Sequence, residues 1–235
     1  MERSKAIGFI GLGSMGEGMA LNLAKKNFSL VLYDINKDKY ERFSDFECSI
    51  ANSKAEVVKN ASTIFTVLPG PKEVEEVILA TDGILENSHQ GDLIVDFSTV
   101  LPETSDNLFN ACKSKEVSFI DSPIGRLAKN AWEGTSMFMI GAKEDDYSKI
   151  RPFLEAMGTT LVHCGEPGTG TRTKLCNNFL AIGSCMLNAE FIALTKGFKL
   201  DLEKTLEVIH GTTATNGQLK LNYTSKVFKD DLKPG

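Results

Sequence analysis

The chain has 235 residues, of which 42% are hydrophobic and 24% charged, as is ordinary for a globular protein of one or two domains. A formal net charge of −5 excludes the broad positive surface that nucleic acid or an anionic membrane would require. The five cysteines include no CxxC pair and the three histidines show no ligand spacing, so we predict neither a disulfide framework nor a metal site.

The location in the cell follows from the same sequence features. No apolar run reaches the length of a membrane span, and the first apolar run begins too early to follow a signal peptide. The cysteine usage fits a reducing compartment. We therefore expect a cytoplasmic protein.

The first organised stretch is an apolar run at residues 6–10, followed by Gly11-x-Gly13-x-x-Gly16 and an apolar helical pattern. In a dinucleotide site the first glycine permits a sharp turn, the second leaves room for a pyrophosphate, and the third lets helix and strand pack closely. The amides at the start of the helix then face the phosphates. We predict that this loop binds the cofactor through Gly11, Leu12, Gly13, Ser14, Met15 and Gly16.

A second apolar run, residues 30–33, ends in Asp34, which lies 21 residues after Gly13. An acid at about this distance binds the ribose hydroxyls and repels a 2′-phosphate, which favours NAD over NADP. Lys37 and Lys39 lie near enough in sequence to soften that preference. The alternative is a structural turn in some other α/β protein.

Strands and helices alternate along the next part of the chain. Helices are expected at residues 37–43, 53–60, 73–79, 103–114 and 145–157, and strands at 48–51, 63–68, 93–96, 117–120, 137–140 and 160–163. This alternation is typical of a doubly wound, mainly parallel sheet. We predict an α/β Rossmann domain over residues 1–163.

From residue 164 the pattern becomes helical. A long helix is expected at 171–198, then helices at 202–210 and 214–227, which form an all-α domain over residues 164–235. The first of these is about 40 Å long, more than one small core can cover. We expect a second subunit to cover it, in a homodimer or homotetramer, and we expect the helical domain to be truncated at its C-terminal end.

Ligands of open α/β sheets bind beyond the carboxyl ends of the strands. There Leu68 and Pro69 offer an apolar edge to the cofactor, and Ser98 and Thr99 offer hydroxyls to the nicotinamide or its ribose and, for Ser98, to the substrate. The alternative for both hydroxyls is helix capping ahead of Pro102.

Two cationic residues are candidates for chemistry. Lys174, at the start of the long helix, shares a helix face with at least one of Asn177 and Asn178, and burial would lower its pKa towards a value suited to general acid catalysis. Arg126 follows Gly125 in a loop and can bind a carboxylate, sulfonate or phosphate in a bidentate manner. The alternatives are a solvated surface lysine and a surface salt bridge.

Together the motifs resemble the β-hydroxyacid dehydrogenases, the family of 3-hydroxyisobutyrate dehydrogenase. The matching segments are Gly8-Phe-Ile-Gly-Leu-Gly-Ser-Met-Gly16, Asp96-Phe-Ser-Thr99, Asp121-Ser-Pro123, Gly134-Thr135 and Gly170-x-x-x-Lys174-x-x-Asn177-Asn178. The resemblance implies a Rossmann domain joined to an all-α domain, oligomers that interlock through the latter, and hydride transfer between a nicotinamide cofactor and a hydroxy acid or aldehyde. It also implies that Lys174 and Asn178 are catalytic and that Asn177 contacts the substrate.

One departure from the family concerns the substrate. Where most members have Ser-Gly-Gly to hold a carboxylate, this chain has Gly125-Arg126-Leu127, which resembles the sulfolactaldehyde reductase branch. We therefore expect NADH-dependent reduction of a small anionic aldehyde, 3-sulfolactaldehyde to 2,3-dihydroxypropane-1-sulfonate, with Gly125 and Arg126 at its anionic end. The family's later segment, with a further lysine near the cofactor, is absent beyond Gly235.

Two alternatives to this reaction remain open. One is a dehydrogenase of the same family acting on 3-hydroxyisobutyrate or tartronate semialdehyde. The other is a non-catalytic dinucleotide-binding module that uses the fold for assembly. The lysine beside two asparagines favours an enzyme over the module.

Overall fold

The computed structural model describes residues 6–231. The chain divides into two compact units between Lys174 and Leu175. The sequence places the domain boundary earlier, after His163, where the alternating pattern ends. In the structure, the first turns of the long helix belong with the sheet unit.

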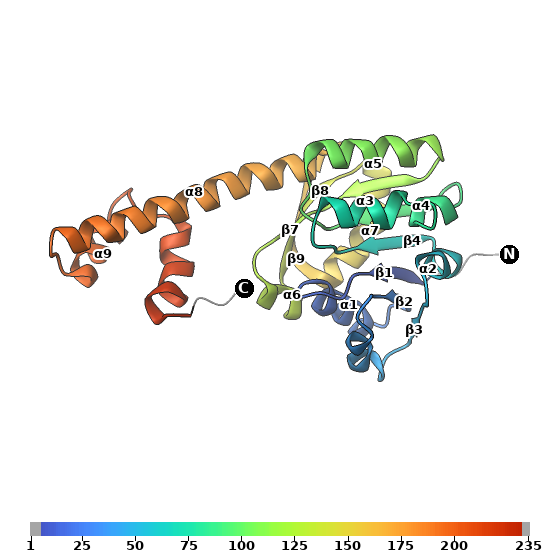
Figure 1. Cartoon of the computed structure of the whole chain (residues 1–235), viewed down its shortest axis with the longest axis horizontal. Helices are drawn as coiled ribbons and strands as arrows, with labels where there is room; N and C mark the ends of the chain where they lie inside the picture. Colours follow the sequence, from blue (N-terminus) through green and yellow to red (C-terminus); the bar gives the residue numbers. More distant parts are fainter. Residues whose placement is uncertain (1–5, 232–235) are drawn as a thin grey trace. The chain divides into compact units, whose positions relative to one another are not determined.

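The first unit contains a nine-stranded sheet in the order β3-β2-β1-β4-β5-β6-β8-β7, with β9 paired to β8 (Figure 1). The strands are β1 (Ile7–Ile10), β2 (Leu30–Tyr33), β3 (Cys48–Ile50), β4 (Thr63–Thr66), β5 (Leu93–Asp96), β6 (Ser118–Asp121), β7 (Ile124–Gly125), β8 (Ser136–Gly141) and β9 (Gly158–Gly165). The first six strands pair in parallel. This confirms the prediction of a doubly wound, mainly parallel sheet.

Helices cover both faces of this sheet. They are α1 (Gly16–Lys25), the 3₁₀ helix η1 (Lys37–Phe43), α2 (Lys54–Asn60), α3 (Pro71–Leu79), α4 (Ile84–Asn87), α5 (Pro102–Ser114), α6 (Ala128–Trp132) and α7 (Glu144–Met157). Side chains alternate along each strand, so neighbouring residues enter different cores. Phe9 packs in the core under α1 and α7, and Ile10 in the core under α2, α3 and α5. Burial on both faces explains the continuous apolar strands of the sequence.

The far edge of the sheet departs from the parallel pattern. β8 runs antiparallel to β6 and to β7, and β9 returns parallel to β8. The sequence analysis does not identify β7, α4 or α6, because two to five residues are too few for a visible periodicity. β7 nevertheless matters for the site, because Arg126 follows its last residue directly.

The second unit contains most of α8 (Thr169–Gly197), then α9 (Leu202–His210), the π-helical turn η2 (Leu219–Tyr223) and the 3₁₀ turn η3 (Val227–Lys229). The helix predicted over residues 214–227 is present but shorter, because helical backbone runs from 217 to 225 with the π-helical turn η2 inside it. Asn216 exchanges hydrogen bonds of 3.1 and 2.8 Å with Asn188 of α8 and accepts one from the Leu219 amide, so helical structure starts only after it. The predicted truncation at Gly235 lies outside the described residues.

Within residues 6–231, α8 is the one helix that could cross a membrane by length and composition, with a mean hydropathy of 1.3 over its most apolar window. Asparagines and glycines interrupt the apolar residues of α8, which is why the sequence shows no unbroken apolar run of this length. Large apolar side chains of α8 are mostly exposed: Phe179, Leu180, Ile182, Met186, Leu187 and Leu194. An exposed apolar face on α8 was expected, and the structure has one.

Candidate functional site

The glycine-rich loop between β1 and α1 shows three different requirements for glycine. Gly11 has φ of 96°, and a Cβ there would lie 2.2 Å from the carbonyl oxygen of Val67. A Cβ on Gly16 would lie 2.0 Å from the Gly11 carbonyl oxygen, whereas one on Gly13 would meet nothing within 4 Å. Gly11 and Gly16 are therefore required for packing, and Gly13 faces open space, as a site for a pyrophosphate demands.

A cavity of about 610 Å³ opens beside this loop. Most of the predicted cofactor residues line it: Gly11, Gly13, Ser14, Met15, Asp34, Leu68 and Pro69. Leu12 and Gly16 are buried in the loop, and Thr99 is exposed and does not line the cavity. The residues lining the cavity thus fit a dinucleotide at the carboxyl ends of β1, β2 and β4.

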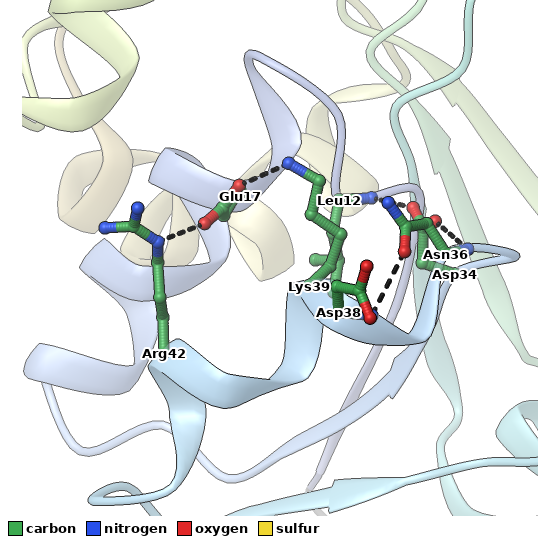
Figure 2. A network of polar contacts seen from close by, with 7 residues as sticks. All are labelled: Leu12, Glu17, Asp34, Asn36, Asp38, Lys39 and Arg42. Atoms are coloured by element: carbon green, nitrogen blue, oxygen red, sulfur yellow. Dashed lines mark hydrogen bonds and ion pairs between the residues drawn. The ribbon is translucent and has the colours of Figure 1, made fainter.

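Asp34 has a second role that the sequence did not reveal. Its Oδ2 accepts the Leu12 amide at 2.5 Å and its Oδ1 accepts the Asn36 amide at 2.7 Å (Figure 2). The Tyr40 hydroxyl binds both the amide and the carbonyl of Asp34. Because a carboxylate oxygen has two lone pairs, Asp34 can hold the glycine-rich loop and still accept ribose hydroxyls.

Ser98 forms a bridge between two strand ends. Its hydroxyl donates to Asp96 Oδ1 at 2.7 Å and accepts the Leu68 amide at 2.9 Å. The hydroxyl hydrogen is thus committed to Asp96, and a direct contact of Ser98 with substrate stays a prediction. The capping alternative is wrong, since α5 begins after Leu101 without a side-chain cap.

The start of α8 is fixed to the sheet by Asp121, a residue that the sequence analysis does not single out for this task. This buried carboxylate accepts the amides of Gly168 and Thr171, each at 2.6 Å. Burial raises the pKa of Asp121, and these hydrogen bonds oppose the rise. A Cβ on Gly170 would lie 2.3 Å from the Met139 carbonyl oxygen, so the helix start lies directly against β8.

Lys174 lies one turn further along α8 and is half-buried. Its ammonium donates to the Ile124 carbonyl at 2.6 Å. Burial lowers the pKa of Lys174, as the sequence analysis expects. The solvated-surface alternative for Lys174 is therefore wrong, and its ammonium lies against the backbone of the Gly125–Arg126 loop.

Asn177 and Asn178 continue α8 into the second unit. Asn177 is exposed and donates to the half-buried Asn178 at 3.4 Å. Lys174 and Asn178 are four residues apart on one continuous helix, a spacing that places side chains on a common face. The catalytic role of Asn178 and the substrate contact of Asn177 stay predictions.

Arg126 does not form the surface salt bridge considered above. Its Nη1 donates to the Thr135 carbonyl and, at 3.0 Å, to Thr159 Oγ1, and its Nη2 donates to Thr160 Oγ1 at 2.9 Å. These partners among residues 6–231 are neutral, so they leave the positive charge uncompensated. The residue is exposed and has φ of 74°, in the left-handed region.

The contacts of His163 are those of a packed side chain. His163 stacks on Tyr147 with ring centroids 4.8 Å apart, and its Nε2 lies 2.7 Å from the Ala142 carbonyl oxygen. The five cysteines are unpaired. No three metal-ligating side chains gather anywhere in residues 6–231.

The glycine-rich loop, Asp34 and the cavity at the strand ends define a dinucleotide-binding α/β fold. Residues 6–165 match the model of the NAD binding domain of 6-phosphogluconate dehydrogenase. Residues 168–235 match the model described as NAD-binding of NADP-dependent 3-hydroxyisobutyrate dehydrogenase.

Individual proteins agree with these matches. The chain is 34% identical over 229 residues to 3-sulfolactaldehyde reductase of Escherichia coli, covering 97% of this chain and 77% of that protein. It is 36% identical over 204 residues to a probable mitochondrial 3-hydroxyisobutyrate dehydrogenase of Dictyostelium discoideum, covering 87% of this chain. A structure of 3-hydroxyisobutyrate dehydrogenase from Mycobacterium tuberculosis with L-serine superposes with a TM-score of 0.89 at 26% identity, covering 99% of this chain and 81% of that one.

The chain therefore belongs to the β-hydroxyacid dehydrogenase family and contains its NAD-binding domain. It spans 62% of the length of the Dictyostelium relative. The relatives named here are dehydrogenases and reductases.

The buried pair of Asp96 and Asp121, opposite each other on β5 and β6, generates a pH prediction. Burial raises the pKa of Asp96 to about 6. Three hydrogen bonds to its Oδ1, from Thr66 and Ser98, lower the pKa and only partly offset this rise. Between about pH 4 and pH 6 the Asp96 carboxyl is ionised in the unfolded chain but still protonated in the folded protein. The free energy of unfolding therefore falls as the pH rises.

Asp96→Asn keeps the oxygen acceptor and removes the titration. We expect the unfolding free energy of the parent protein to fall relative to that of Asp96→Asn by about 2 kcal/mol between pH 4 and pH 6, and the difference to level off above. Denaturant unfolding across this range measures it. A difference that is constant with pH would show that Asp96 does not titrate there.

Proposed function

We propose that this protein is an NADH-dependent reductase of a small anionic aldehyde. The observation that carries the proposal is the half-buried Lys174 ammonium, held 2.6 Å from the Ile124 carbonyl beside Gly125 and Arg126, in a chain of a dehydrogenase family. The nicotinamide cofactor supplies the hydride. Lys174 donates a proton to the developing alkoxide, and its lowered pKa brings that donation closer to neutral pH.

Arg126 is proposed to hold the anionic end of the substrate. A guanidinium carries five N–H donors, and the contacts to Thr135, Thr159 and Thr160 use three of them. The threonines orient the guanidinium plane and leave its charge for a ligand. The two remaining N–H donors of the guanidinium can bind oxygens of a sulfonate, which has three. This supports 3-sulfolactaldehyde over a simple hydroxy acid as the substrate.

Two other functions have support of their own. The 36% identity to a 3-hydroxyisobutyrate dehydrogenase favours a carboxylate substrate, for which tartronate semialdehyde is a further candidate. A non-catalytic module would need only the dinucleotide cavity. The buried position of Lys174 favours an enzyme, because such burial of a lysine costs free energy that a pure binding module has no reason to retain.

We also propose that the protein is cytoplasmic and self-associates through α8. Phe179, Leu187 and Leu194 belong to a group of exposed large apolar side chains on one helix, whereas exposed apolar residues on the surface of a monomer are usually scattered singly. The opposite side of α8 contacts the residues that follow it within the second unit, through Asn188 and through the Cys185 carbonyl, which accepts the Tyr223 hydroxyl at 2.6 Å.

The first test concerns the proton donor. Lys174→Ala should lower kcat with NADH and an aldehyde by about 10²- to 10⁴-fold, while the Kd of NADH stays within about twofold. Steady-state kinetics and a fluorescence titration of NADH measure the two effects. Thr173→Ala, at an exposed neighbour, is the matched control. Turnover close to that of the parent protein would remove Lys174 from the mechanism.

The second test concerns the substrate. In a panel of aldehydes that differ only in a sulfonate, carboxylate or neutral end, NADH oxidation should be fastest with the sulfonate. Arg126→Ala should lower kcat/KM for the sulfonate by about 10²-fold and for the neutral aldehyde by less than about threefold. An equal loss for all three would contradict the anion contact, and no turnover with any of them would favour the binding module.

The third test concerns α8. Sedimentation analysis without detergent should give a dimer or tetramer, and Leu187→Glu should shift it to monomer without loss of helical circular dichroism. Lys196→Glu, at an exposed position on the other side of the same helix, controls for the added negative charge. A soluble monomer for the parent protein, or solubility only in detergent, would overturn self-association through this face.

A further inference from the structure

Glu17 is a buried acid on α1 that the proposed reaction does not use. Glu17 is only 4% exposed to solvent. Its Oε2 lies 2.9 Å from Lys39 Nζ, and its Oε1 lies 2.8 Å from Arg42 Nε. Figure 2 shows both cations reaching from η1 towards this one carboxylate.

The two cations belong to the segment that follows the ribose-binding acid. Asn36, bound to Asp34 through its amide, caps η1 by accepting the Asp38 amide at 3.1 Å. In Figure 2 Asp34 and Asn36 lie at one end of η1, whereas Lys39 and Arg42 turn towards α1. The Arg42 guanidinium also lies over the Trp132 ring, 5.4 Å from its centroid.

This arrangement bears on the choice between NAD and NADP. The 2′-phosphate of NADP adds about two negative charges next to Asp34, and binding it requires a cation from the same segment. Lys39 and Arg42 are cations of that segment, five and eight residues after Asp34. If either moved to a phosphate, the buried Glu17 carboxylate would lose a partner, which is costly in a desolvated place.

We propose that Glu17 is a specificity-determining residue that favours NAD over NADP by retaining Lys39 and Arg42. It acts through these two side chains, without contact to the cofactor. Asp34 repels the 2′-phosphate, and Glu17 withholds two of the three cations of residues 37–42 that could offset the repulsion, leaving only Lys37. The inference rests on the proposed use of a nicotinamide cofactor, and for Lys39 it predicts the opposite of the sequence-based expectation that this residue softens the preference for NAD.

The test is a set of nucleotide affinities measured on the whole protein without aldehyde. Glu17→Gln removes the charge and keeps the shape. We expect the Kd of NADPH to fall roughly five- to tenfold, while the Kd of NADH changes by less than about twofold. Glu41→Gln, which removes the same charge from an exposed position of η1, should leave both affinities unchanged.

A second variant includes one arm that needs no change at Glu17. Lys39→Met in the parent protein should leave the affinity for NADPH unchanged, because Lys39 is held by Glu17. In the Glu17→Gln background the same change should remove at least half of the gain in NADPH affinity. Thermal unfolding of each variant reports any loss of stability separately.

The outcomes separate this inference from the proposed function. Equal changes in NADH and NADPH affinity for Glu17→Gln, or weaker NADPH binding for Lys39→Met alone, would overturn the role of Glu17. Binding of neither nucleotide would overturn cofactor use and this inference with it. Nucleotide binding with the expected shift but no aldehyde turnover would overturn only the reductase.

Discussion

The arrangement of the site depends on the buried carboxylate of Asp121. It binds two amides at the start of α8 from the end of β6, and so fixes a helix to a strand that precedes it by some fifty residues. Gly170 allows this contact, because any larger residue would collide with β8. Lys174 follows one turn later, and its reach to the Ile124 carbonyl follows from where Asp121 holds the helix.

The parts predicted correctly from the sequence are those determined by neighbouring residues. The spacing of Gly11, Gly13 and Gly16 is a local requirement of one turn, and the structure assigns each glycine the expected surroundings. The Ser-x-x-Glu spacing of Ser53 and Glu56 is equally local, and Ser53 caps α2 by accepting the Glu56 amide. The parallel strands are recognisable because burial on both faces leaves a continuous apolar run.

The parts missed depend on partners distant in sequence. Nothing in the residues around Glu17 indicates that Lys39 and Arg42 converge on it, and only the fold brings α1 and η1 together. The sequence around Ser98 likewise does not show that its hydroxyl joins Asp96 to the Leu68 amide. Hydroxyls and carboxylates have many possible partners, so composition and spacing do not select among them.

The backbone conformation of Arg126 has an energetic cost for the loop that follows β7. A non-glycine residue with φ of 74° costs roughly 1 kcal/mol or more relative to glycine, which adopts this conformation freely. A glycine at position 126, as in the Ser-Gly-Gly pattern with which Gly125-Arg126-Leu127 was compared, would avoid this cost. The arginine thus holds its hydrogen bonds to Thr135, Thr159 and Thr160 against the preference of its own backbone, so part of the free energy of those three contacts is spent on keeping the loop in this conformation.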